Sequence, residues 1–228
     1  MSPLTSDDLA AMPLFADLAE DENLMLLDRH RETMYQVDQV IVMEQDWGES
    51  LFLLKDGLAK VRRYTSDGEE VILSLLGPGD VFGEMAALEG ASRSADVVSL
   101  TPLSLIKIRS APFVSLLTQQ VKFALSLARL EAGRLRDLNQ RFALQSADST
   151  TRLLDALAYL ARKSSLEQDP QARLPQLAQR EIALLAGLSR ETTSRTLTKL
   201  RRRGTVGEQN GCLVLADLEP LQKRDLIP

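Results

Sequence analysis

Apolar and polar residues follow three successive patterns along the chain. Between residues 7 and 31 the apolar residues recur at helical intervals, but Pro13 and an acidic turn interrupt them, which predicts short helices. From Val37 to about Ile108, short stretches rich in Val, Ile and Leu are separated by turn signals such as Lys55-Asp-Gly and Gly77-Pro-Gly-Asp. Short strands between regular turns are typical of an antiparallel sandwich or barrel. The sequence therefore predicts an N-terminal β-roll, a barrel of the jelly-roll kind.

A long helical pattern follows from Pro112 to about Gln145. An apolar stripe runs along it with a spacing of seven residues, formed by Val121, Ala128, Leu135 and Phe142. A helix from Val121 to Gln145 would be a rod of about 37 Å, long enough to pair with a copy of itself. Glu131 inside the stripe leaves open the alternative that the helix packs only on its own barrel.

The last 80 residues of the chain predict a winged helix-turn-helix. A helix over residues 150–163 precedes two close helices, from about Gln179 to Ala186 and from the N-cap Ser189 to Arg203-Gly204. Asn210-Gly then predicts the hairpin of a wing. We expect an α+β fold with a β-roll at 1–111, a long dimerisation helix and hinge at 112–148, and a winged helix-turn-helix at 149–228.

Charge is distributed unevenly between these parts. The net charge is −5, but residues 1–148 hold 14 Lys and Arg against 23 Asp and Glu, whereas residues 149–228 hold 13 against 9. An acidic body with a basic end favours a nucleic-acid-binding module joined to another domain, with a chance fluctuation as the alternative.

The cysteine and histidine content excludes several kinds of site. One Cys and one His permit no intramolecular disulfide, no multi-Cys or multi-His metal site and no iron-sulfur cluster. We expect no metal cofactor. The sequence contains no membrane-length apolar run and no basic signal peptide, which predicts a cytoplasmic protein without a membrane partner.

The segment from Phe82 to Ala95 has residues that suit a sugar phosphate. Glu84 can accept a hydrogen bond from a ribose hydroxyl, and the guanidinium of Arg93 can pair with phosphate oxygens. Small residues would let backbone N–H groups approach the same anion: Gly83, Ala86, Ser94 and Ala95. From residue types alone, a buried ion pair between Glu84 and Arg93 is an equal alternative.

This segment resembles the cyclic-AMP receptor protein family. The family's phosphate-binding cassette has a Gly-Glu-Leu-Ala turn, followed about nine residues after the Glu by Arg, then Ser or Ala, then Ala. The matching residues here are Gly83, Glu84, Met85, Ala86, Arg93, Ser94 and Ala95, after the lead-in Gly77-Pro-Gly-Asp80. The resemblance implies that Glu84 binds the ribose 2′-hydroxyl and that Arg93 and Ser94 bind the cyclic phosphate. It also implies that Leu73 and Ser74 line the base.

Cyclic AMP is the effector that the resemblance implies, but the long helix departs from the family's pattern. The best-known members use a Thr-Ser pair there to contact adenine, whereas this chain has Arg134-Leu-Arg-Asp-Leu-Asn139, so that Arg134, Leu138 and Asn139 face the effector in this interpretation. Asn139 could bind a base edge, or it could be an ordinary exposed residue. Cyclic GMP and cyclic di-GMP therefore stay open. The intact cassette disfavours 2-oxoglutarate, and whether DNA binding needs an effector also stays open.

The segment from Leu188 to Arg195 resembles the family's recognition helix. Glu191 and Arg195 are four residues apart and share one face with Arg190, so the three can read guanine and cytosine in a major groove. Contacts to the DNA backbone are expected from Arg180, Ser189, Thr192 and Lys199. The resemblance implies a homodimer, paired through the long helix, on a palindrome with half-sites that resemble TGTGA, about 34 Å apart.

Two further expectations concern activity and partners. The acidic loop at 67–70 matches a place where relatives contact RNA polymerase, with a solvated turn as the alternative. The chain carries no phosphate-binding Gly-rich Lys motif and no Ser-His-Asp set, so we expect no enzyme. We therefore interpret the chain as a DNA-binding transcription regulator. A cyclic-nucleotide-regulated subunit that does not bind DNA is the alternative from another class.

Overall fold

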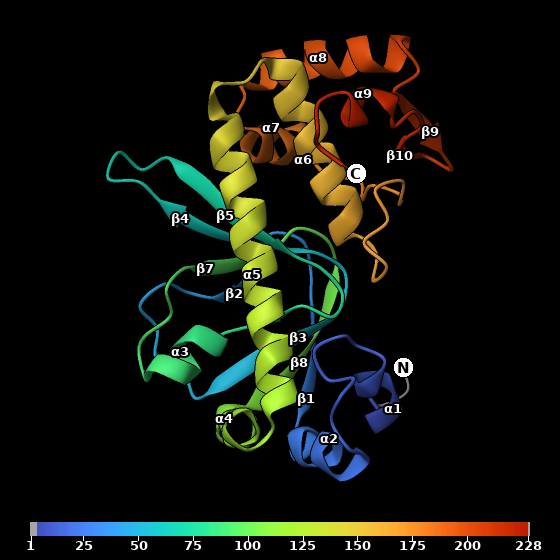
Figure 1. Ribbon diagram of the computed structural model, residues 1–228. Helices are drawn as coiled ribbons and strands as arrows, with labels where there is room; N and C mark the ends of the chain where they lie inside the picture. The colour runs from blue at the N-terminus through green and yellow to red at the C-terminus, as the bar shows by residue number, and fades with distance from the viewer. Residues whose placement is uncertain (1–3, 228) are drawn as a thin grey trace. The chain divides into compact units, whose positions relative to one another are not determined.

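Helices and strands follow one another in the computed structural model, which describes residues 4–227 (Figure 1). The helices are α1 (Ser6–Ala10), α2 (Glu20–Leu27), α3 (Glu84–Glu89), α4 (Ser110–Gln119), α5 (Val121–Ala143), α6 (Ser149–Lys163), α7 (Gln179–Ala186), α8 (Arg190–Arg202) and α9 (Glu219–Gln222), with a 3-10 turn at Leu144–Ser146. The strands are β1 (Arg31–Tyr35), β2 (Val40–Val42), β3 (Ser50–Asp56), β4 (Ala59–Tyr64), β5 (Glu70–Leu76), β6 (Val81–Phe82), β7 (Asp96–Ser99), β8 (Leu103–Arg109), β9 (Val206–Gln209) and β10 (Cys212–Leu215). The predicted α+β class is confirmed.

The chain divides into two compact units, and each unit is built from two separate segments of the sequence. The first unit comprises Met1–Ala59 with Pro78–Arg136, and the second comprises Lys60–Gly77 with Asp137–Pro228. Most of the β4–β5 hairpin thus belongs to the unit that contains the winged helix-turn-helix. The domain limits proposed from the sequence, at residues 111 and 148, stay a prediction.

The first unit is built on an antiparallel sheet in the strand order β1-β8-β3-β6. Because side chains alternate between the two faces of a strand, Leu51 and Leu53 of β3 point to the same face. They lie opposite Ile108 and Ile106 of β8 in the register of the sheet, and all four are buried.

Helices cover that face of the sheet and complete the core of the first unit. The core joins these strand residues to side chains of α1, α4 and α5 and of the segment after α1. The ring of Phe123 lies 5.2 Å from that of Phe113 and 5.8 Å from that of Phe15. Burying one such side chain contributes about 1.5–3 kcal/mol. The predicted short N-terminal helices are confirmed as α1 and α2.

The long helical segment is two helices rather than one. Gln120 has an extended backbone (φ −111°, ψ 96°), which ends α4 before α5 begins at Val121. The 23 residues of α5 make a rod of about 35 Å. All four stripe residues of this helix are exposed, whereas Phe123 and Leu127 on another face are buried in the first unit. The helix therefore packs on the first unit through Phe123 and Leu127 and still presents an exposed apolar stripe.

The second unit contains a helix-turn-helix followed by a wing, as the sequence predicted. Helix α6 begins behind Asp148, whose carboxylate accepts from the N–H groups of Thr150 and Thr151. Helix α7 ends at Gly187, which adopts a left-handed conformation (φ 60°), and α8 begins behind the N-cap Ser189. The wing is the antiparallel pair β9–β10. Its turn places Asn210 at a positive φ, a conformation that Asn adopts more readily than most residues.

Candidate effector site and DNA-binding face

The cassette begins where β6 turns into α3. Gly83 lies at this turn with φ 84°, a left-handed conformation that favours glycine. A Cβ atom at Gly83 would meet Arg93 Nη1 at 2.4 Å and the carbonyl oxygen of Ser50 at 3.3 Å. The glycine therefore permits both the turn and the close approach of the Arg93 guanidinium.

Arg93 is buried beside this turn. Its Nη1 donates to the carbonyl oxygen of Gly83 at 2.9 Å, and its Nη2 donates to the carbonyl oxygen of Ser50. The guanidinium carbon lies 5.8 Å from the centre of the Phe52 ring. Burial lowers the pKa of Arg93, while the charges of Glu84 and Asp46 oppose this; arginine nonetheless stays protonated in proteins. A guanidinium has five N–H donors, so Arg93 keeps donors beyond the two bonds that fix it.

Glu84 is the first residue of α3 and is 4% exposed. Arg134 Nη1 donates to Glu84 Oε1 at 3.1 Å, whereas Glu84 Oε2 is buried and has no hydrogen-bond partner among the described residues. Burial raises the pKa of Glu84, the positive charge of Arg134 opposes this, and the negative charge of Glu131 adds to it. A buried carboxylate oxygen without a partner needs a donor, which a ribose hydroxyl can supply.

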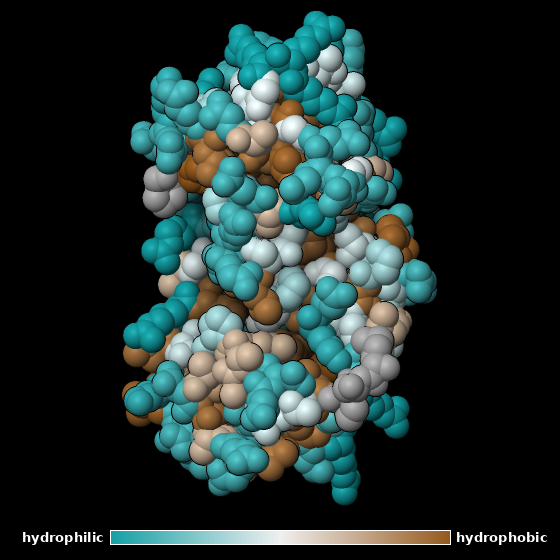
Figure 2. All heavy atoms as spheres, turned by 90° about the vertical axis from the view of Figure 1, so that its right-hand side faces the viewer, coloured by the Kyte–Doolittle hydropathy of each residue, from teal (hydrophilic) through white to brown (hydrophobic). Residues whose placement is uncertain are grey.

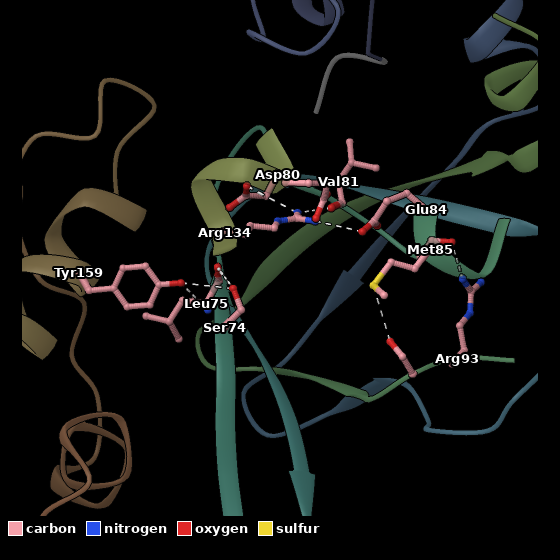
Figure 3. Close-up of polar contacts among 12 residues, drawn as sticks. Ser74, Leu75, Asp80, Val81, Glu84, Met85, Arg93, Arg134 and Tyr159 are labelled. Carbon is pink, nitrogen blue, oxygen red and sulfur yellow. Dashed lines mark hydrogen bonds and ion pairs between the residues drawn. The ribbon is translucent and has the colours of Figure 1, made fainter. Parts of the chain in front are cut away.

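Arg134 of α5 links the long helix to the cassette. Its guanidinium lies among Asp80, Val81 and Glu84, as Figure 3 shows. Nη1 also donates to Glu131 Oε1 at 2.8 Å, and Nη2 lies 3.8 Å from Asp80 Oδ1. Nη2 further donates to the carbonyl oxygen of Val81. Arg134, which was expected to face the effector, lies beside Glu84, the carboxylate assigned to the ribose, and its contact with an effector stays a prediction.

The remaining cassette residues line the same turn. Ala86 and Ala95 are buried, whereas Met85 and Ser94 are exposed, with Ser94 Oγ 4.0 Å from the sulfur of Met85. Two carbonyl partners of Arg93, those of Gly83 and Ser50, were not foreseen as anchors. The backbone N–H of Arg93 donates to the carbonyl oxygen of Asp46 at 2.9 Å, a contact that residue types did not indicate either.

Four of the expected effector residues lie in the second unit. Ser74 Oγ lies 3.2 Å from the hydroxyl oxygen of Tyr159, and the carbonyl oxygen of Leu73 accepts from Arg141 at 3.0 Å. Leu138 and Asn139 are exposed on α5. The structure thus brings together the cassette residues and Arg134, while the contribution of these four residues stays a prediction.

The residues expected to read bases lie on the exposed face of α8. Arg190, Glu191 and Arg195 are exposed, and Arg195 Nη2 lies 2.9 Å from Glu191 Oε1. The opposite face is buried through Thr193, Thr196, Leu197 and Leu200. In Figure 2 the surface at the top of the view, where Figure 1 draws α8, is largely hydrophilic. A hollow on this helix is lined by Arg195, Lys199, Arg202 and Arg203, with Ser194 and Thr198 between them.

The residues expected to contact the DNA backbone differ in their surroundings. Ser189 Oγ accepts from the N–H of Thr192, and its hydroxyl lies 2.9 Å from the Thr192 hydroxyl. Lys199 is exposed on α8. Arg180 of α7 instead donates to Glu70 Oε2 at 2.8 Å, and about half of its side chain is exposed. In the loop at 67–70, Asp67 and Glu69 are exposed, whereas the Glu70 side chain is buried.

The described part of the chain lacks a membrane-spanning helix and a cluster of metal ligands. Residues 4–227 contain no helix that is long and apolar enough to cross a membrane. They also contain no group of three or more His, Cys, Asp and Glu side chains placed to hold a metal ion.

Comparison with known proteins identifies both parts of the chain. Residues 32–120 match the family model described as cyclic nucleotide-binding domain, and residues 151–224 match that described as Crp-like helix-turn-helix domain. The cyclic AMP receptor protein of Thermus thermophilus is 34% identical over 195 residues, which cover 85% of this chain and 88% of the relative. A CRP-like cAMP-activated global transcriptional regulator of Mycobacterium tuberculosis is 28% identical over 186 residues, 81% of this chain and 83% of the relative.

A solved structure shares the fold. That of FixK2 from Bradyrhizobium japonicum matches with a TM-score of 0.73 and 24% identity, over 85% of this chain and 96% of the other. The chain therefore belongs to the CRP/FNR family of transcription regulators and not to a family of enzymes, as its sequence predicted, with a cyclic-nucleotide-binding domain followed by a Crp-like helix-turn-helix domain.

Proposed function

We propose that this chain is a cytoplasmic, homodimeric transcription regulator that binds cyclic AMP and then recognises a palindrome with TGTGA-like half-sites. One observation carries the effector half of the proposal. Glu84 Oε2 is a buried acceptor without a partner among the described residues, and the buried guanidinium of Arg93 is near enough for the charge of Glu84 to act on its pKa. A ribose hydroxyl beside a cyclic phosphate offers the matching donor and anion. No metal is needed for this binding.

Each residue of the cassette has a separate task in this proposal. Glu84 accepts from the ribose 2′-hydroxyl through Oε2, while Arg134 keeps the other oxygen and stabilises the ionised carboxylate. Arg93 and Ser94 bind the cyclic phosphate, and the carbonyl oxygens of Gly83 and Ser50 hold the Arg93 guanidinium in place. Leu73 and Ser74 line the base.

The DNA half of the proposal rests on α8. Arg190 and Arg195 donate to guanine and Glu191 accepts from cytosine, because these are the pairings that their geometry favours in a major groove. Ser189, Thr192, Lys199 and Arg180 contribute contacts to the DNA backbone. Two copies paired through the α5 stripe would present two such helices to successive grooves. The exposed end of the loop at 67–70 is the proposed contact with RNA polymerase.

Cyclic GMP and cyclic di-GMP are the alternative effectors. They stay open because α5 lacks the Thr-Ser pair with which the best-known relatives contact adenine. Leu138 cannot bind a base edge, whereas Asn139 can donate and accept, and both are exposed on α5. Calorimetric titration with the three nucleotides distinguishes them. Tightest binding of cyclic AMP supports the proposal, and binding of none of the three refutes its effector half.

Two substitutions test the division of labour between the units. Arg93→Ala is expected to weaken effector binding and effector-dependent DNA binding, while the exposed Arg109→Ala serves as its control. Arg190→Ala is expected to spare effector binding and to lose preference for the palindrome over scrambled DNA, about 10- to 100-fold. Its control is the exposed Arg224→Ala. Equal loss of effector affinity in Arg93→Ala and Arg190→Ala would refute the assignment.

A further inference from the structure

A buried lysine connects the β4–β5 hairpin to the helix-turn-helix within the second unit. Lys60 lies near the start of β4, and only 2% of its side chain is exposed. Its Nζ lies 2.6 Å from Glu70 Oε1 on β5 and 2.6 Å from Glu181 Oε2 on α7. A buried ammonium is costly unless it is paired, so these two carboxylates account for the position of the lysine.

Both carboxylates contact Lys60, and Glu181 has fewer other cationic partners than Glu70. Both approach the same ammonium, and their side chains are only 7% and 12% exposed. Without the positive charge, two ionised groups would face each other in surroundings that screen them poorly. Lys60 is therefore the buried cation that offsets the repulsion between these carboxylates, and the half-exposed Arg180, 2.8 Å from Glu70 and 3.9 Å from Glu181, is the second.

Two arginines complete what we name the Lys60 cluster: Lys60, Arg62, Glu70, Arg180 and Glu181. Arg180 Nη2 donates to Glu70 Oε2 at 2.8 Å, and Arg62 Nη1 lies 3.5 Å from Glu70 Oε1. Burial acts to raise the pKa of Glu70, but the hydrogen bonds and charges of Lys60, Arg180 and Arg62 outweigh it and lower that pKa. Glu70 therefore stays ionised and bound at neutral pH.

Tyr159 of α6 makes a second polar contact with the same strand. Its hydroxyl oxygen accepts from the N–H of Leu75 at 3.0 Å and lies 3.2 Å from Ser74 Oγ, as Figure 3 shows. Arg141 donates to the carbonyl oxygens of Leu73, at 3.0 Å, and of Ile72, at 2.5 Å. Side chains of other elements thus bind polar groups along β5, from the Glu70 carboxylate at one end to the Leu75 N–H near the other.

The ion pairs of the Lys60 cluster leave the proposed DNA-binding residues of α8 exposed. Arg190, Glu191 and Arg195 remain exposed on α8 while Glu181 of the preceding helix is bound to Lys60. The contact therefore fixes α7 without covering the residues that read bases. A contact made of charges is also easier to form and break than an apolar one, because each group regains water when the two parts separate.

We propose that Lys60 is a positioning residue that holds α7 on the β4–β5 hairpin and thereby orients the recognition helix for effector-dependent DNA binding. This inference rests on the proposed function, since it concerns how the same regulator transmits its signal. Ser74, expected to line the base, lies on the same strand as Glu70, and its partner Tyr159 lies on α6. An effector that contacts β5 would therefore bind to the same hairpin that Lys60 connects to α7 of the helix-turn-helix.

The test compares Lys60→Met with Lys55→Met in the full-length protein. Lys55 also pairs with a carboxylate, at 3.2 Å from Glu32 Oε1, but it lies in the first unit and is 23% exposed. For Lys60→Met we expect cyclic AMP affinity within about threefold of the parent, and a loss of about tenfold or more in the gain of DNA affinity that cyclic AMP produces. Lys55→Met should change neither. Titration calorimetry and fluorescence anisotropy with palindromic DNA give the two quantities.

Amide hydrogen exchange tests the contact without DNA or effector. In Lys60→Met the backbone amides of residues 70–76 and 179–186 should exchange faster than in the parent protein. The amides of α6 should keep their protection, because the buried face of this helix is mostly apolar. The double variant Lys60→Met/Glu181→Gln removes one of the two facing carboxylates and should recover protection in both segments, together with part of the lost coupling. This recovery would not follow if Lys60 acted only through general stability.

The outcomes separate this inference from the proposed function. Absence of any effect of cyclic AMP on DNA binding by the parent protein would refute the proposed function, while the exchange experiment would still test the contact. Unchanged exchange in Lys60→Met would overturn the inference. An increase of DNA affinity in Lys60→Met without effector would also overturn it, because the cluster would then restrain the recognition helix rather than position it.

Discussion

Gly83→Ala is the substitution whose effect follows most directly from the geometry of the cassette. The added Cβ would lie 2.4 Å from Arg93 Nη1 and 3.3 Å from the carbonyl oxygen of Ser50. The second atom belongs to the backbone of β3, so the guanidinium has to move. Since Arg93 is the group proposed to bind the phosphate, we expect the effector to lose its principal charged partner.

Two separate energies contribute to this effect. An alanine at φ 84° is strained by about 1–2 kcal/mol relative to glycine, which lowers the stability of the fold. A charge-assisted hydrogen bond that the displaced Arg93 can no longer make contributes about 1.5–3 kcal/mol. The second energy concerns binding alone and corresponds to a loss of effector affinity of about 10- to 100-fold.

Gly90→Ala provides the matched control. Gly90 ends the same helix, α3, at φ 62°, and a Cβ there would meet no atom within 4 Å. Both variants should therefore lose stability in thermal denaturation, Gly83→Ala more than Gly90→Ala because Arg93 also has to leave its two carbonyl partners, but only Gly83→Ala should lose effector affinity in calorimetry. Effector affinity within about threefold of the parent in Gly83→Ala, or an equal loss in Gly90→Ala, would refute the assignment of Arg93.

Three other predictions concern the dimer and two buried carboxyl groups. Phe142→Glu should convert a dimer to a monomer in sedimentation velocity, because it places a charge in the apolar stripe, whereas Lys122→Gln on the same helix should not. Burial raises the pKa of Glu84, so effector affinity should fall as the pH is lowered from neutral, beginning above the pH at which an exposed glutamate titrates. Calorimetry at several pH values checks this, and Glu84→Gln should remove the dependence. Burial also raises the pKa of Asp155, so its carboxyl contributes stability that is present at acid pH and lost as the pH rises through its folded-state pKa. Asp155→Asn should therefore raise Tm near neutral pH, by about 2–4 °C for each kcal/mol recovered, and leave Tm unchanged below the pKa of an unfolded aspartate.

The elements of the fold could be predicted because their sequence signals are local. Buried strands such as β3 and β8 appear as short apolar runs between turns, and Asn210-Gly211 specifies a tight hairpin through its own backbone preferences. The break at Gln120 could not be predicted in this way. Glutamine is an acceptable helix residue, and its extended backbone depends on how α4 and α5 pack on the sheet.

The residues of the cassette could be named from the sequence, but the hydrogen bonds that position them could not. Glu84 and Arg93 stand out as charges among small residues, and the family resemblance assigned their tasks. The anchoring of Arg93 by the carbonyl oxygen of Ser50 leaves no trace in side-chain types, since any residue could supply that oxygen. Lys60 gives no local signal either, because a lysine in a strand ordinarily lies on a solvated face, and its partner Glu181 is 121 residues away.

The two oxygens of Glu84 suggest how the first unit could transmit the presence of the effector. Arg134 binds Oε1, whereas the proposed ribose hydroxyl would bind Oε2, so the effector does not have to displace the arginine. A donor at Oε2 favours the ionised carboxylate and so lowers the pKa of Glu84. A fully ionised Glu84 binds the Arg134 guanidinium more strongly. Because Arg134 lies on α5, which also carries the proposed dimer stripe, the effector and the long helix would each stabilise the state that favours the other, as reciprocal coupling requires.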